Sequence, residues 1–247
     1  MKTSNHLLRR LTAALLAAVL ALSIALPVFA SDDGDTIYIN SVSDLLSLAK
    51  SCAYDQWSVG KTVILQKDLS LEGMLWEPIP SFSGQFKGNG HTISDLTITG
   101  QYSPAGLFGI VEEQGSIESL SVRGIVSVSD SADTTTGGIV GINHGTLINC
   151  QFTGVVTGDS EVGGIVGRNE SEGTIDHSTA RAIVTGKSST GGIAGYNLGA
   201  ITGCTNVGSI NTEYQEASLD TDGFTAKMVD QINNKIAAAD DDAHLHT

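Results

Sequence analysis

Five carboxylates close together in the chain are the residues best suited to chemistry. They lie in two neighbouring segments: Asp159, Glu161, Glu170, Glu172 and Asp176. Arg168 and Arg181 are the nearest cations. Two or three acids that converge within several ångströms could cleave a polysaccharide by acid–base chemistry. Clustered carboxylate oxygens could instead bind calcium. Solvated loop charge is the third interpretation, and we favour it because these residues fall mostly in expected loops.

Other catalytic and metal-binding signals are weak. The sequence contains no H-E-x-x-H, G-x-S-x-G, Walker A or C-x-x-C motif. His91 and His144 are expected near one turn of different coils, and His177 faces outward, so a zinc site would need closer convergence. We therefore expect no enzyme activity, no cofactor-binding residues and no metal other than calcium at the five carboxylates.

The elements that position these residues are copies of one repeat. GGIVGINHGTLINC from Gly137 returns in variant form at Gly163 and Gly191, with a weaker copy at Ala105, at spacings of 32, 26 and 28 residues. Such periods are typical of solenoids. Short β-branched runs, joined by connections too short for a crossover helix, predict one coil of a parallel β-helix per copy. The predicted fold is all-β, with about five to six coils and short helices at both ends.

A gapless alignment of five copies, the first starting at Gln85, places like residues at inward positions. The three columns that it predicts are Ile93, Ile117, Leu147, Ile175 and Ile201; Leu96, Leu120, Cys150, Ser178 and Cys204; and Ile98, Val122, Phe152, Ala180 and Asn206. Asn143, Asn169 and Asn197 also align. Asn tolerates left-handed corners and can stack its amide in a ladder, so we interpret these three as structural rather than ligand-binding.

The three cysteines are expected to be unpaired. Cys150 and Cys204 share a column but lie two coils apart, roughly 9 to 10 Å at the strand spacing of a sheet. A disulfide does not span that distance. We expect both to be small buried hydrophobes, with Cys52 also unpaired.

Helices are predicted at both ends of the solenoid. Ser41 and Asp44 form a capping signal before an apolar stripe, which predicts an amphipathic helix over 42–52 that closes the N-terminal end. A second stripe, with apolar residues four apart, starts after Asp222: Phe224, Met228, Ile232 and Ile236. This helix would cap the C-terminal end, pack along the side of the solenoid, or recruit a partner.

Residues 1–30 have the features of a secretory signal peptide with cleavage after Ala30, although an uncleaved anchor is the alternative. We divide the remainder into 31–61 (strand and capping helix), 62–213 (β-helix) and 214–247 (amphipathic helix and acidic tail). The chain without 1–30 keeps ten basic and 27 acidic residues, a net charge of −17. That charge argues against nucleic acid and anionic membranes as partners.

The segments GGIVGINHGTLINCQFTG, GGIVGRNESEGTIDHS and GGIAGYNLGAITGC resemble the GLUG repeat of bacterial secreted and surface proteins. FKGNGHTISDLTITG and PAGLFG resemble segments of pectate-lyase-like β-helix proteins. The resemblance covers roughly residues 62–210. In the IgA-cleaving metallopeptidases that carry such repeats, activity depends on a zinc motif that this sequence does not contain, so the resemblance does not imply protease activity.

We expect a secreted or cell-surface β-helix module that is not catalytic and serves either as an adhesin-like display or as a structural display. Loops at 127–136, 157–161 and 185–190 would project from one corner of successive coils, where solenoids commonly bind partners. Surface glycans, or host or bacterial surface proteins, are the expected partners. The alternatives are a polysaccharide lyase or hydrolase with outward carboxylates, or a fragment of a larger surface protein.

Overall fold

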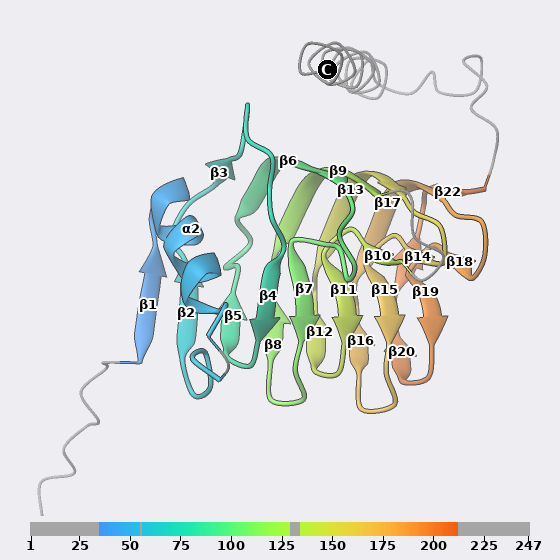
Figure 1. Cartoon of the computed structure of the whole chain (residues 1–247). Coiled ribbons are helices and arrows are strands. Elements are labelled where there is room, and N and C mark those ends of the chain that lie inside the picture. The colour runs from blue at the N-terminus through green and yellow to red at the C-terminus, as the bar shows by residue number, and fades with distance from the viewer. Residues whose placement is uncertain (1–34, 55, 129–133, 212–247) are drawn as a thin grey trace, which may run out of the picture. The chain divides into compact units, whose positions relative to one another are not determined.

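The computed structural model describes residues 35–54, 56–128 and 134–211. The predicted signal peptide and the predicted C-terminal helix lie outside these residues. The described residues from Thr36 onward belong to one compact unit. Its strands wind around a common axis, so that equivalent strands of successive coils lie side by side (Figure 1). The predicted parallel β-helix is confirmed, with about six turns.

A full coil contributes one strand to each of four parallel sheets, here called A to D. Sheet A contains β1 (Thr36–Ile39), β2 (Thr62–Leu65), β5 (Gln85–Lys87), β8 (Ser116–Glu118), β12 (Thr146–Ile148), β16 (Thr174–Asp176) and β20 (Ala200–Thr202). Sheet B contains β3 (Leu69–Ser70), β6 (Thr92–Gly100), β9 (Ser121–Val128), β13 (Gln151–Thr157), β17 (Thr179–Thr185) and β21 (Thr205–Asn206), and β22 (Ser209–Ile210) also pairs with β17.

Sheets C and D complete the coil. Sheet C contains β4 (Ile79–Phe82), β7 (Phe108–Val111), β11 (Val140–Asn143), β15 (Val166–Asn169) and β19 (Ala194–Asn197). Sheet D contains β10 (Thr135–Gly137), β14 (Glu161–Gly163) and β18 (Thr190–Gly191). The path from one coil to the next therefore runs D, C, A, B.

Like residues face one another from coil to coil, as predicted, from residue 117 onward. Leu147 pairs with Ile117 on one side and with Ile175 on the other. Phe152 pairs with Val122 and Ala180. Because side chains alternate between the two faces of a strand, this register keeps each column inside the coil.

The first copy of the repeat is aligned differently, and the prediction was wrong there. Phe86, rather than Ile93, pairs with Ile117, and Ile93 pairs with Val122. A register shift follows Ile93, so Leu96 pairs with Gly124. Asp95, inside this shift, has a φ of 58°. A β-bulge adds a residue to one strand only, which a gapless alignment does not detect.

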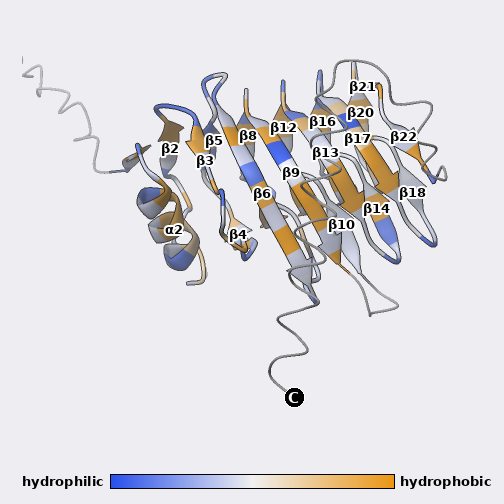
Figure 2. Ribbon diagram, turned by 90° about the horizontal axis from the view of Figure 1, so that it is seen from above, coloured by the Kyte–Doolittle hydropathy of each residue, from blue (hydrophilic) through white to orange (hydrophobic). Residues whose placement is uncertain are grey.

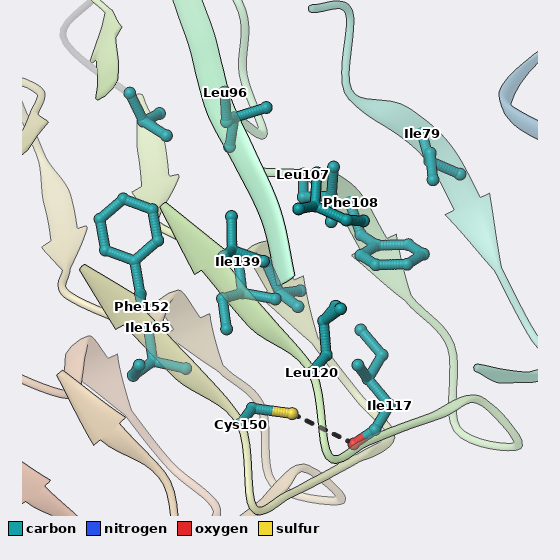
Figure 3. Close-up of a cluster of buried hydrophobic side chains, with 14 of the residues drawn as sticks. Ile79, Leu96, Leu107, Phe108, Ile117, Leu120, Ile139, Cys150, Phe152 and Ile165 are labelled. Carbon is teal, nitrogen blue, oxygen red and sulfur yellow. Dashed lines mark hydrogen bonds between the residues drawn. The ribbon is translucent and has the colours of Figure 1, made fainter. Parts of the chain in front are cut away.

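The core is a continuous stack of apolar side chains inside the coils. Phe82, Phe86 and Phe108 are fully buried, with ring centroids 5.4 to 6.3 Å apart. Burying one such side chain stabilises the fold by ~1.5–3 kcal/mol. Figure 3 shows the stack continuing through Phe152 and Cys150 in the next turns.

The first glycine of each GG pair is required by the bend that follows it. A Cβ at Gly137 would lie 2.0 Å from the Val140 oxygen. The equivalent contacts are 1.9 Å at Gly163 and 2.0 Å at Gly191. No side chain fits at such a distance, so the repeated glycines mark a corner of the coil rather than a ligand site.

The three aligned asparagines form the predicted ladder. Asn143 Nδ2 donates to Asn169 Oδ1 at 2.7 Å, and Asn169 Nδ2 donates to Asn197 Oδ1 at 2.8 Å. Asn143 and Asn169 are fully buried, whereas Asn197 is exposed. Buried amides need hydrogen-bond partners, and the ladder supplies them to both polar atoms of Asn169 and to Asn143 Nδ2, although not to Asn143 Oδ1. The structural interpretation of these residues is therefore confirmed.

The predicted N-terminal helix is α2 (Val42–Ser51), which buries Leu45 and Leu48 against the core. It lies beside β2, β3 and β4, near the N-terminal end of the solenoid (Figure 2). Asp44 N donates to Ser41 Oγ, and Asn40 N donates to Asp44 Oδ2. These bonds form the predicted capping signal: the first satisfies an amide of the first helical turn, and the second holds the residue before the N-cap.

Asn169→Ala should destabilise the protein by ~2–3 kcal/mol, because it removes both ladder hydrogen bonds, including the one that the buried Asn143 amide donates. Urea unfolding followed by circular dichroism measures the change. The matched control is Asn197→Ala at the exposed end of the ladder, which should cost less than ~1 kcal/mol. Equal losses in the two variants would contradict the ladder's stabilising role.

Asp44→Asn should make the free energy of unfolding less dependent on pH in the acidic range. The Asn40 N–H and then the Ser41 hydroxyl lower the pKa of Asp44, so its contribution is present above the unfolded-state pKa and is lost as pH falls through the folded value. The difference in urea midpoint between Asp44→Asn and the parent should be full above about pH 5 and vanish toward about pH 2. Ser43→Asn, which removes no carboxylate, should show a pH-independent difference. A difference for Asp44→Asn that persists at low pH would contradict this role of the charge.

Candidate functional site

The connections from sheet B to sheet D lie at one corner, as predicted, because β9, β13 and β17 are neighbours and so are β10, β14 and β18. They are shorter than predicted, since strands extend into the expected loops. We call Thr134 with residues 158–160 and 186–189 the loop corner. Residues 129–133 lie outside the described residues.

Hydrogen bonds join each connection of the loop corner to the next. Thr134 Oγ1 accepts from Asp159 N at 3.0 Å and from Ser160 N at 3.3 Å. Asp159 O accepts from Lys187 N at 3.0 Å and from Ser188 N at 3.1 Å. The backbone here is therefore held in a defined arrangement across three coils.

One ion pair crosses the loop corner. Lys187 Nζ lies 2.7 Å from Asp159 Oδ1. The Asp159 side chain is 15% exposed and that of Lys187 is 78% exposed. Exposed pairs of this kind add little stability, so the main effect of this one is to place the Lys187 ammonium group beside Asp159 at the surface.

A second polar cluster lies beside the loop corner, centred on Arg168. Arg168 Nη1 is 3.3 Å from Glu161 Oε1, and Nε is 2.8 Å from Glu170 Oε1. The Nε–H bond is not aimed at that oxygen, so this contact is an ion pair rather than an aligned hydrogen bond. The guanidinium carbon lies 4.9 Å from the centre of the Tyr196 ring, a cation–π distance.

The five predicted carboxylates thus separate into different environments. Arg168 brings Glu161 and Glu170 together, Asp159 binds Lys187, and Asp176 Oδ2 lies 2.8 Å from the ring of its neighbour His177. Glu172 lies in an exposed turn, where a hydrogen bond from Ser171 lowers its pKa. Over the residues that the structure describes, no three His, Cys, Asp or Glu side chains form a metal-binding group. The calcium hypothesis stays a prediction.

His91 and His144 do not lie at one corner, contrary to the prediction, whereas His177 is exposed, as predicted. His91 follows β5 at the corner between sheets A and B, whereas His144 lies between β11 and β12, at the corner between sheets C and A. His91 Nδ1 is 3.1 Å from Asp68 Oδ1, and the Thr92 N–H and His91 lower the pKa of Asp68. This pair depends on the pairing of β3 with β6. The gapless alignment started at Gln85 and so did not include β3.

The cysteines are unpaired, as predicted. Burial raises the pKa of Cys150 to about 12 and that of Cys52 to about 11, so neither thiol is a nucleophile at neutral pH. The Cys150 thiol instead donates to the Ile117 carbonyl (Figure 3). Cys204, predicted to be buried, is only half-buried, because it lies in the last coil that the structure describes.

No helix among the described residues is long and apolar enough to cross a membrane. The predicted signal peptide or anchor at 1–30 lies outside those residues.

Comparison with known proteins points to one repeat family. The family model of the GLUG motif matches residues 158–185. Halomucin from Haloquadratum walsbyi is 36% identical over 155 residues, which cover 58% of this chain and 2% of Halomucin. An inferred Gly-rich membrane protein from Evansella cellulosilytica is 30% identical over 137 residues, 40% of this chain and 16% of that protein. This chain therefore matches only a small part of either relative.

A solved structure is also similar. The crystal structure of an inferred immunoglobulin A1 protease from Bacteroides ovatus has a TM-score of 0.42 and 16% identity, over 72% of this chain and 77% of that chain. This chain therefore contains a GLUG motif at residues 158–185, within a parallel β-helix of in-register coils.

Proposed function

We propose that this protein is a secreted or cell-surface module that binds a partner through its loop corner, in the manner of an adhesin, without catalysing a reaction. The observation that carries the proposal is the chain of hydrogen bonds from Thr134 through Asp159 to Lys187 and Ser188. Connections held in place before binding lose little conformational entropy when a partner binds. A rigid sheet therefore presents polar groups at fixed positions.

The chemistry of the loop corner favours a glycan as partner. Lys187, Ser188 and Ser189 are exposed, and together they offer hydroxyl groups and one ammonium. Such groups can hydrogen-bond to sugar hydroxyls, and the ammonium can bind a sugar carboxylate. The acidic chain, with a net charge of −14, disfavours nucleic acid. A host or bacterial surface protein is the other expected class of partner.

Two observations support a location at the cell surface. One similar protein is named as a membrane protein. Residues 1–30 have the sequence pattern of a secretory signal, which predicts export. Both observations suit a module displayed outside the cell.

The arrangement of the carboxylates favours a non-catalytic role. Glu161 and Glu170 both contact the guanidinium of Arg168. Asp159 is largely covered and contacts Lys187. Acid–base cleavage of a glycan needs two carboxyl groups placed on either side of the bond that breaks, with access to the substrate. A glycan lyase or hydrolase stays the alternative.

Replacing residues 186–189 with a Gly-Ser segment of equal length should weaken glycan binding at least tenfold, because the exposed ammonium and its neighbouring hydroxyls are removed. The backbone N–H groups that donate to Asp159 O are kept, so the fold should persist. A glycan array, followed by titration of the best ligand, measures the effect. The matched control replaces Ser171 and Glu172, exposed residues in a different turn, and should bind like the parent. Equal binding by all three proteins would contradict the proposal that the loop corner binds the glycan.

The purified protein should release no product from a panel of acidic and neutral polysaccharides, as measured by reducing ends and by absorbance of unsaturated products. Activity that disappears in Glu161→Gln or Asp159→Asn would contradict the non-catalytic proposal. Activity that both variants retain would indicate a contaminating enzyme.

A further inference from the structure

The outer face of sheet B differs in charge from the rest of this acidic protein. Three neighbouring strands, β9, β13 and β17, each turn alternate side chains outward (Figure 2). None of these outward residues is acidic, although the chain has 27 acidic residues and a net charge of −14. We call this set the arginine face: Ser121, Arg123, Ile125 and Ser127 on β9, Gln151, Thr153, Val155 and Thr157 on β13, and Thr179, Arg181, Ile183 and Thr185 on β17.

In-register pairing arranges the arginine face in rows that cross the strands. Arg123 and Arg181 both pair with Thr153, so they lie in one row on either side of it. At the ~4.8 Å spacing of paired strands, their Cα atoms are ~10 Å apart. Both side chains are exposed. The row therefore presents two guanidinium groups whose points of attachment are fixed by the backbone.

Two further rows run parallel to the arginine row. Neighbouring rows are two residues apart along each strand, a distance of ~7 Å. The row next to the arginines is apolar and half-buried, and the row beyond it carries hydroxyl groups. The apolar row is Ile125, Val155 and Ile183, and the hydroxyl row is Ser127, Thr157 and Thr185.

The two arginines have different electrostatic surroundings. The Thr92 N–H, then His91 and more weakly Arg123 lower the pKa of Asp68, so Arg123 already interacts with a carboxylate. Arg181 forms no ion pair with any other residue that the structure describes. Arg181 is therefore the arginine more available to an anionic ligand.

We propose that the arginine face binds an anionic glycan in which a carboxylate-bearing sugar alternates with a neutral sugar. A guanidinium binds a carboxylate through two parallel hydrogen bonds. A sugar ring in an extended glycan is about as long as one strand spacing, ~5 Å. A glycan lying across the strands therefore brings every second sugar to an arginine. Its C–H groups contact the apolar row, and its hydroxyl groups hydrogen-bond to the hydroxyl row.

The spacing of charge separates this ligand from other polyanions. Duplex DNA carries one charge per ~1.7 Å, so most of its phosphates would face an acidic protein without a cation to bind. An alternating glycan carries about one charge per ~10 Å, which matches the distance between Arg123 and Arg181. A peptide that adds a strand needs a free sheet edge, whereas β13 is paired on both sides. Recognition at the arginine face therefore depends on side chains.

Hyaluronan, which has one carboxylate per disaccharide, is the probe for this surface. Isothermal titration calorimetry at low ionic strength measures its binding to the full chain. A hyaluronan oligosaccharide should bind more tightly than polygalacturonate, which has a carboxylate on every sugar. It should also bind more tightly than polyglutamate, an acidic peptide, and than neutral dextran.

Arg181→Gln should weaken hyaluronan binding about fivefold, and Arg123→Gln with Arg181→Gln should weaken it by at least about tenfold, because exposed ion pairs are lost. Arg181→Lys should give an intermediate affinity, since an ammonium keeps the charge and loses the paired hydrogen bonds. The matched control is Lys87→Gln. It removes the same charge from the outer face of sheet A, and it should bind like the parent.

Equal hyaluronan binding by the parent and the double arginine variant would overturn the proposal. Tighter binding of polygalacturonate or polyglutamate, or equal binding of dextran, would overturn the assigned ligand class. If the double variant unfolds, the comparison of Arg181→Gln with Arg181→Lys and Lys87→Gln decides the matter.

The arginine face and the loop corner are distinct surfaces, so their binding can be lost separately. The chain with residues 186–189 replaced by Gly and Ser keeps both arginines and should still bind hyaluronan. Loss of hyaluronan binding in that chain, with retention in the double arginine variant, would place the glycan at the loop corner and overturn the proposal.

Discussion

The structure depends on in-register hydrogen bonding between parallel strands of successive coils. Each strand of an interior coil pairs with the strand before and the strand after it, as β13 pairs with β9 and β17 over seven residues. A slip of one residue would turn every inward side chain toward solvent. The stack of Val126, Val156 and Val184, all buried, shows what this register maintains. Similar residues at equivalent positions are therefore a physical requirement of the fold.

The same register decides where polar groups can lie. Asn143 and Asn169 are tolerated inside the coil because each lies beside another amide at the same corner. The connections of the loop corner are likewise held because equivalent turns of successive coils meet, so that Thr134 reaches the amide of Asp159. Binding chemistry at the corner is thus a consequence of the coil stacking.

Much of this arrangement could be predicted from the sequence, because strong repetition gives the register directly. The interior columns, the asparagine ladder and the position of the loops all follow from one alignment of the later copies. The Arg168–Tyr196 contact was missed, although these residues directly precede Asn169 and Asn197 and so lie in register. The first copy could not be aligned, because the shift around Asp95 depends on three-dimensional pairing. The His91–Asp68 pair was missed for the same reason.

The most direct test of the coil register is disulfide trapping on the outer face of sheet B. Thr153 and Arg181 are paired residues on neighbouring strands, and neither side chain is buried. At the ~4.8 Å spacing of paired strands, cysteines at these two positions fall within the range for a disulfide. Thr153→Cys with Arg181→Cys should oxidise readily to a disulfide detected by peptide mass spectrometry, whereas Thr153→Cys with Ile183→Cys should not. Preferential formation of the second disulfide would contradict the register on which this account rests.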